Sequence, residues 1–172
     1  MTRNASLSGA IHDVQARLGS IRIAVTAVAG LELDAETRHD MLTNASDESL
    51  RASAELAGVS ALATCLLDGG TAEPCDVAAA VETAAEVARL GGLDVRVEIG
   101  DAPSISARPD SLAAALAALL RIVGGAGKQV AVHVTTDGID VRGADTEVLP
   151  PIAGYLIEAL DVSLPITFGA LA

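Results

Sequence analysis

The first thirty residues carry apolar side chains at alternating steps of four and three positions. The pattern positions are Leu7, Ile11, Val14, Leu18, Ile21, Val25 and Val28. This spacing predicts a helix from about residue 6 to about residue 29, with a heptad seam along one face and an end at Gly30. His12 lies beside this seam, and Asp13 follows about 100° further round the helix. We therefore expect His12 to flank a helix–helix interface with one ring edge facing water.

A second stretch repeats this spacing and predicts another long helix over about residues 35–67. Its pattern positions are Leu42, Ala45, Ser49, Ala52, Leu56, Val59, Ala63 and Leu66. Asp34 or Thr37 is a candidate N-cap. Two heptad helices joined by a short turn form an antiparallel hairpin. Because a lone hairpin cannot cover both of its apolar faces, we expect a symmetric dimer with a four-helix bundle. The alternative is a monomeric hairpin packed against its own C-terminal half.

After Gly70 the pattern changes to shorter elements. Alternating apolar residues predict strands near 95–99, 130–134 and 139–142, and a last strand within 164–171. Helical patterns predict helices over 77–90, 111–123 and 151–160, and residues 102–106 read as a short extended piece. The sequence therefore predicts an α+β protein. A helical hairpin in residues 1–72 is followed by a small α/β sandwich in residues 73–172, with helices over one face of the sheet.

Charge and composition narrow the possible functions. The 172 residues include 11 Lys and Arg against 23 Asp and Glu, and the net charge of -12 argues against nucleic acid as a partner. No signal peptide and no run of about 18 apolar residues is evident, so we expect a cytoplasmic protein outside the membrane. Cys65 and Cys75 lack the spacing of a zinc site, so we expect buried thiols and no metal.

Two stretches resemble motifs of bacterial sensor histidine kinases. The sequence His12-Asp13-Val14-Gln15-Ala16-Arg17-Leu18 resembles the H-box of that family, with Arg17 in place of the usual Pro. The stretch 106–112 and the leucines that follow it resemble the lead into the N-box helix. With the order of elements, this resemblance covers nearly the whole chain. It implies a dimerisation hairpin that carries a phosphorylated His, followed by a domain like a truncated histidine-kinase ATPase domain.

Departures from the family pattern imply that ATP is not a cofactor. Ala118 and Ile122 stand where the N-box carries asparagines, and neither side chain offers magnesium an oxygen ligand. The first glycine box falls on residues 145–149, where Asp145 resembles the adenine-reading aspartate but Glu147 replaces a glycine. No glycine-rich lid follows.

This departure is similar to that of bacterial histidine phosphotransferases that evolved from degenerate histidine kinases. The similarity implies that His12 accepts a phosphoryl group from a response-regulator receiver domain and passes it to another. Asp13 would orient or polarise His12, while Gln15, Arg17 and Arg22 would contact the partner. The alternative is a non-enzymatic dimeric adaptor that binds a regulator or kinase. His39 and His133 are expected at the surface.

Overall fold

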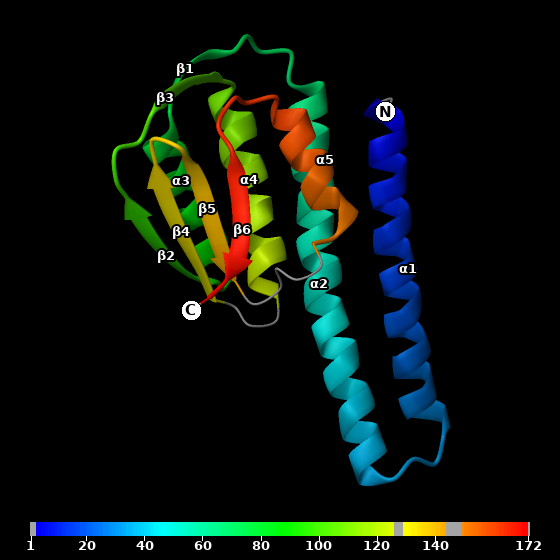
Figure 1. Ribbon diagram of the computed structural model, residues 1–172. Helices are drawn as coiled ribbons and strands as arrows, with labels where there is room; N and C mark the ends of the chain where they lie inside the picture. Colours follow the sequence, from blue (N-terminus) through cyan, green and yellow to red (C-terminus); the bar gives the residue numbers. More distant parts are fainter. Residues whose placement is uncertain (1–2, 126–128, 144–148, 172) are drawn as a thin grey trace.

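The computed structural model describes residues 3–125, 129–143 and 149–171 (Figure 1). Its helices are α1 (Arg3–Gly30), α2 (Ala35–Leu67), α3 (Val77–Leu90), α4 (Pro109–Gly124) and α5 (Pro151–Leu160). Its strands are β1 (Glu73–Asp76), β2 (Asp94–Ile99), β3 (Ser104–Ala107), β4 (Gln129–Thr135), β5 (Gly138–Gly143) and β6 (Ile166–Ala170). The predicted α+β class is confirmed, because a helical hairpin precedes a mixed α/β region with a four-stranded sheet.

The hairpin forms because two long helices are joined by only four residues and pack along each other. Asp34 is the N-cap of α2, and its carboxylate accepts hydrogen bonds from the Thr37 N–H and the Thr37 hydroxyl, both at 2.8 Å. Of the two predicted capping residues, Asp34 is therefore the cap, and Thr37 donates to it.

The four-stranded sheet has the order β2-β4-β5-β6. The pairs β2–β4 and β5–β6 are parallel, and β4–β5 is the antiparallel hairpin predicted from Asp137-Gly138. Helices α3 and α4 lie over one face of the sheet, and no helix or strand of the described residues covers the opposite, open face (Figure 1). A separate antiparallel pair joins β3 to β1, which the sequence did not predict because Glu73-Pro74-Cys75-Asp76 shows no apolar alternation.

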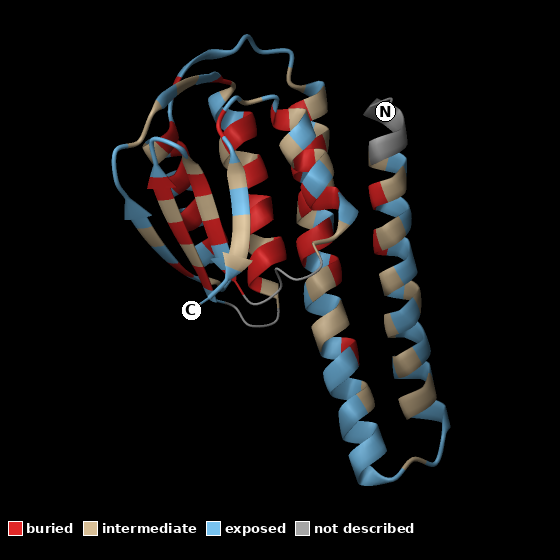
Figure 2. Ribbon diagram, in the orientation of Figure 1, coloured by how far each residue is buried: buried red, intermediate tan, exposed pale blue. Residues whose placement is uncertain are grey.

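The hydrophobic core lies around α4, which packs against the sheet on one side and against α2 on the other. Leu62 and Cys65 of α2 belong to the same buried cluster as Leu116 and Leu119 of α4. The two predicted units thus share one core, and the far half of the hairpin extends away from it with mostly exposed residues (Figure 2). The C-terminal part of α2 thus packs on the C-terminal half of the chain, as the alternative prediction of a hairpin packed on its own C-terminal half expected.

Among the described helices, only α2 is long and apolar enough to cross a membrane by length and composition, with a window of mean hydropathy 1.3. Of that window, 39% is buried inside the protein. The C-terminal part of α2 contributes residues such as Leu62 and Cys65 to the core, whereas the larger share of this window is not buried.

Candidate functional site

His12 stands on the outer face of α1. Its side chain is 81% exposed, and its Nδ1 lies 3.6 Å from the Asp13 Oδ1, whose side chain is 45% exposed. Two residues later, Val14 is buried toward α2. Two positions on a helix differ by about 200° of rotation, so His12 points away from the hairpin interface. The distance to Asp13 is an electrostatic contact rather than a hydrogen bond, and it leaves Nε2 facing solvent.

The helix surface next to His12 is open. Ala16, one turn later, is exposed, and a Cβ placed on Gly19 would meet nothing within 4 Å. Small side chains on this face leave room for another protein to approach the imidazole. The structure confirms that the His12 ring faces water, but places it on the side of α1 away from α2 and not, as expected, beside the hairpin interface. The chemistry of His12 stays a prediction.

Arg17 lies in the interface between α1 and α2. Its Nη1 is 2.7 Å from Glu48 Oε2, and its Nε is 2.8 Å from Glu55 Oε1. Burial disfavours the charge, but hydrogen bonds and attraction from the two carboxylates outweigh it and raise the pKa of Arg17. The sequence predicted that Arg17 contacts a partner, but the structure instead holds its guanidinium between the two helices of the hairpin.

Glu55 is the buried member of this cluster and was not singled out from the sequence. Its residue is only 4% exposed, and among the described residues its Oε2 has no hydrogen-bond partner. Glu48 and Glu55 are seven positions apart, which is one heptad. Both stand one position before the predicted pattern positions Ser49 and Leu56, so the heptad pattern did not single them out.

The pH dependence of stability is expected to report on Glu48. The hydrogen bond from Arg17, helped by the charges of Arg17 and Arg51 and opposed by burial, lowers the pKa of Glu48 below its ordinary 4.5. The ion pair therefore stabilises the fold fully above about pH 4.5, and this contribution is lost as the pH falls through the lowered pKa. Denaturant titrations at neutral and acidic pH should show a larger acid loss for the wild type than for Glu48→Gln. An equal loss in both proteins would contradict this assignment.

The predicted heptad seam divides into two rows. Val14 is buried and Ile21 and Val28 are half-buried toward α2, but Ile11, Leu18 and Val25 are 42%, 53% and 50% exposed. In the single chain, α2 therefore covers only part of the predicted seam, and packing of the remaining positions on a second copy stays a prediction. The apolar stripe is wider than one helix can cover, so every second member faces solvent.

A matching apolar row runs along α2. Leu42 and Leu56 are 47% and 55% exposed, and Ser49 and Ala63 continue the row at seven-residue steps. On each helix, the exposed row is offset about the helix axis from the side that faces the other helix. Viewed from the N-terminus of each helix, the offset has the same rotational sense on α1 and on α2. Because the helices are antiparallel, both rows lie on one side of the hairpin, opposite the side of α2 that contacts α4 and α5. We call this side the open apolar face. Gln15 and Arg22 are exposed beside it, between its α1 row and His12.

The positions that resemble the N-box face the hairpin. Ala118 and Ile122 are 3% and 5% exposed. A Cβ on Gly58 of α2 would lie 3.4 Å from the Ile122 Cδ1 and 2.8 Å from the Ile152 Cγ1. Helix α2 thus packs directly on this surface of α4. Asp145 and Glu147 lie outside the described residues.

The other candidate side chains form no further centre. His39 is exposed, and His133 pairs with Glu98 at 3.1 Å on the open face of the sheet. Both cysteines are free and buried as predicted, and burial raises the pKa of each thiol. Within residues 3–125, 129–143 and 149–171, no group of three or more His, Cys, Asp or Glu is arranged to hold a metal ion. No protein-family model and no curated protein matches the chain.

Proposed function

We propose that this protein is a dimeric histidine phosphotransferase of a two-component phosphorelay, with His12 as the phosphoryl carrier. The observation that carries the proposal is the exposed imidazole on the outer face of α1, with its Nδ1 beside the Asp13 carboxylate. The H-box resemblance of residues 12–18 supports the same role. The partner is a response-regulator receiver domain with a phosphorylated aspartate.

Phosphoryl transfer requires only a few groups from the carrier protein. The lone pair of the His12 Nε2 attacks the phosphorus of the aspartyl phosphate in line, a P–N bond forms, and the P–O bond to the aspartate breaks. The leaving group is the partner's carboxylate, and the receiver domain supplies the charges that stabilise the transferred group. The Asp13 carboxylate stabilises the positive charge that develops on the imidazole. The reverse step returns the phosphoryl group to a second receiver domain.

The packing of α4 supports a phosphotransferase without autokinase activity. The surface that the resemblance assigns to magnesium and phosphate carries Ala118 and Ile122, which are buried. Ile122 also lies against Gly58 of the hairpin. A nucleotide on this surface would have to displace α2 from the shared core. We therefore propose that the phosphoryl group comes from another protein and not from ATP.

A second copy of the chain is the proposed occupant of the open apolar face. Its positions repeat at seven-residue steps on both helices, which is the spacing of a bundle seam, and all of them are apolar except Ser49. A two-fold axis along the hairpin would bring the α1 row of one copy onto the α2 row of the other. The resulting four-helix bundle would cover Leu18, Val25, Leu42 and Leu56, and it would leave His12 outside.

Phosphoryl transfer from a labelled receiver domain tests the proposal. A panel of response-regulator receiver domains is phosphorylated, freed of ATP and mixed with the protein. Acid-labile label is expected on the wild type and is expected to be absent from His12→Gln. His39→Gln is the matched control, because His39 is also exposed on a helix of the same hairpin, and it should accept label like the wild type.

Two results would contradict the assignment of His12 as the phosphoryl carrier. Label on His12→Gln would place the acceptor elsewhere. Stable binding of a receiver domain without any transfer of label would instead support the non-enzymatic adaptor.

A further inference from the structure

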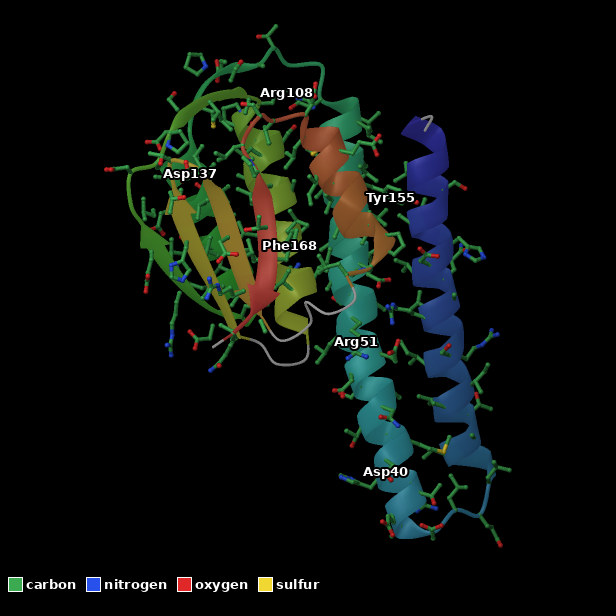
Figure 3. All side chains as sticks on the ribbon, in the orientation of Figure 1. Asp40, Arg51, Arg108, Asp137, Tyr155 and Phe168 are labelled. Carbon is green, nitrogen blue, oxygen red and sulfur yellow. The ribbon has the colours of Figure 1, made fainter. Side chains whose placement is uncertain are left out.

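A cavity of about 570 Å³ lies where three distant segments of the chain meet. Its walls are the end of α2 with the turn that follows, the Ser106–Arg108 segment before α4, and the Tyr155–Asp161 part of α5. In Figure 3 Arg108 lies near the end of α2, and Tyr155 lies on the side of α5 that faces α1. The volume is that of a site for a small molecule.

The lining of this cavity is apolar in one part and charged in another. Leu62, Leu66 and Leu160 supply aliphatic surface, and Leu62 and Leu160 are buried. Asp68, Arg108, Glu158 and Asp161 supply the charged groups. A ligand that fits both parts needs an aliphatic portion and a charged end.

Arg108 is held in place by a neutral acceptor. Its Nη1 donates to the main-chain oxygen of Asp68 at 2.7 Å, and among the described residues no carboxylate lies within 4.0 Å of its guanidinium. The Asp68 carboxylate makes other hydrogen bonds: it accepts one from the Ser111 hydroxyl at 2.6 Å and one from the Gly70 N–H at 2.9 Å. The half-buried Arg108 side chain is therefore fixed. Its charge acts on the Asp68 carboxylate without forming an ion pair within 4.0 Å, and its other N–H groups make no hydrogen bond to a described residue, which suits them to bind a carboxylate.

The acidic side chains of α5 restrict the ligand further. Glu158 and Asp161 line the same cavity, and both are exposed. With Asp68 they give the cavity three carboxylates against one guanidinium, so a phosphate or other multiply charged anion is disfavoured. An ammonium group next to the ligand carboxylate would be attracted by the α5 carboxylates.

We propose that this cavity binds a free α-amino acid with an aliphatic side chain. The Arg108 guanidinium pairs with the ligand carboxylate, Glu158 and Asp161 attract the ammonium group, and the side chain lies on Leu62, Leu66 and Leu160. The proposal goes beyond phosphoryl transfer and does not depend on it.

Calorimetric titration of the full chain with L-leucine tests the site. We expect saturable binding with one ligand per chain. Leucinamide, which lacks the carboxylate, and N-acetyl-leucine, which lacks the ammonium group, should each bind at least about tenfold more weakly. No saturable heat with leucine at millimolar concentration, or equal binding of leucinamide, would overturn the proposal.

Variants assign the two charged contacts. Arg108→Gln should weaken leucine binding at least about tenfold. Glu158 is exposed on α5, so its replacement should not impair folding. Glu158→Gln should weaken binding of leucine but not of N-acetyl-leucine, which has no ammonium group. Arg96→Gln, at an exposed position of β2, is the control and should bind like the wild type. Wild-type affinity in both Arg108→Gln and Glu158→Gln would refute the site.

Discussion

Replacement of Arg17 by alanine is expected to lower the free energy of unfolding by about 2–3 kcal/mol. Removal of one partner of a fully buried ion pair costs about 3–5 kcal/mol, because the remaining charge stays buried without compensation. The Arg17 side chain is still 32% exposed, which reduces the cost. Glu55, whose side chain is 6% exposed, carries the penalty, since Arg17 is the only hydrogen-bond partner that the described residues give it.

Denaturant unfolding followed by helical circular dichroism measures this effect. All proteins are compared at one protein concentration, because association would add to the apparent stability. Arg22→Ala, an exposed arginine on the same helix, is the control and is expected to change stability by no more than about 0.5 kcal/mol. The double variant Arg17→Met/Glu55→Leu removes both charges and should recover most of the loss. Equal effects of Arg17→Ala and Arg22→Ala would show that the ion pairs do not stabilise the hairpin.

Local patterns were sufficient to predict most of the fold. Heptad spacing predicted both long helices, and alternation in residues 130–142 predicted the β4–β5 hairpin, because in these segments one face is buried and the other is not. Strand β1 escaped prediction because its pairing of Cys75 with Ile105 is a long-range contact. Nothing in four residues that contain Pro74 indicates such a partner.

For the candidate site, the sequence predicted only those features that depend on the spacing of residues along a single helix. The position of His12 relative to Val14 predicted its exposure, since rotation about one helix axis depends on spacing alone. The role of Arg17 depends on the register between α1 and α2, which places it against Glu48 and Glu55. Similarly, the division of the seam follows from how far α2 covers α1, and spacing along one helix does not contain that information.

A charged residue on the open apolar face is expected to prevent dimerisation. Substitution Leu18→Glu is expected to raise the dissociation constant of the proposed dimer at least about a hundredfold. Leu18 is 53% exposed in a single chain and lies in the middle of the α1 row. In a four-helix bundle it would be buried, and an unpaired carboxylate in an apolar interface costs several kcal/mol. Two-fold symmetry places the substitution in the interface twice.

Sedimentation equilibrium over a range of concentrations separates this effect from unfolding. Leu90→Glu is the matched control, because Leu90 is 85% exposed on α3, outside the hairpin. It should associate like the wild type, while Leu18→Glu should sediment as a monomer with unchanged helical content. If the wild type is itself a monomer at every concentration, the open apolar face does not bind a second copy. Since His12 lies outside the proposed interface, monomeric Leu18→Glu is expected to retain phosphoryl acceptance, so association and phosphoryl transfer can be assessed independently.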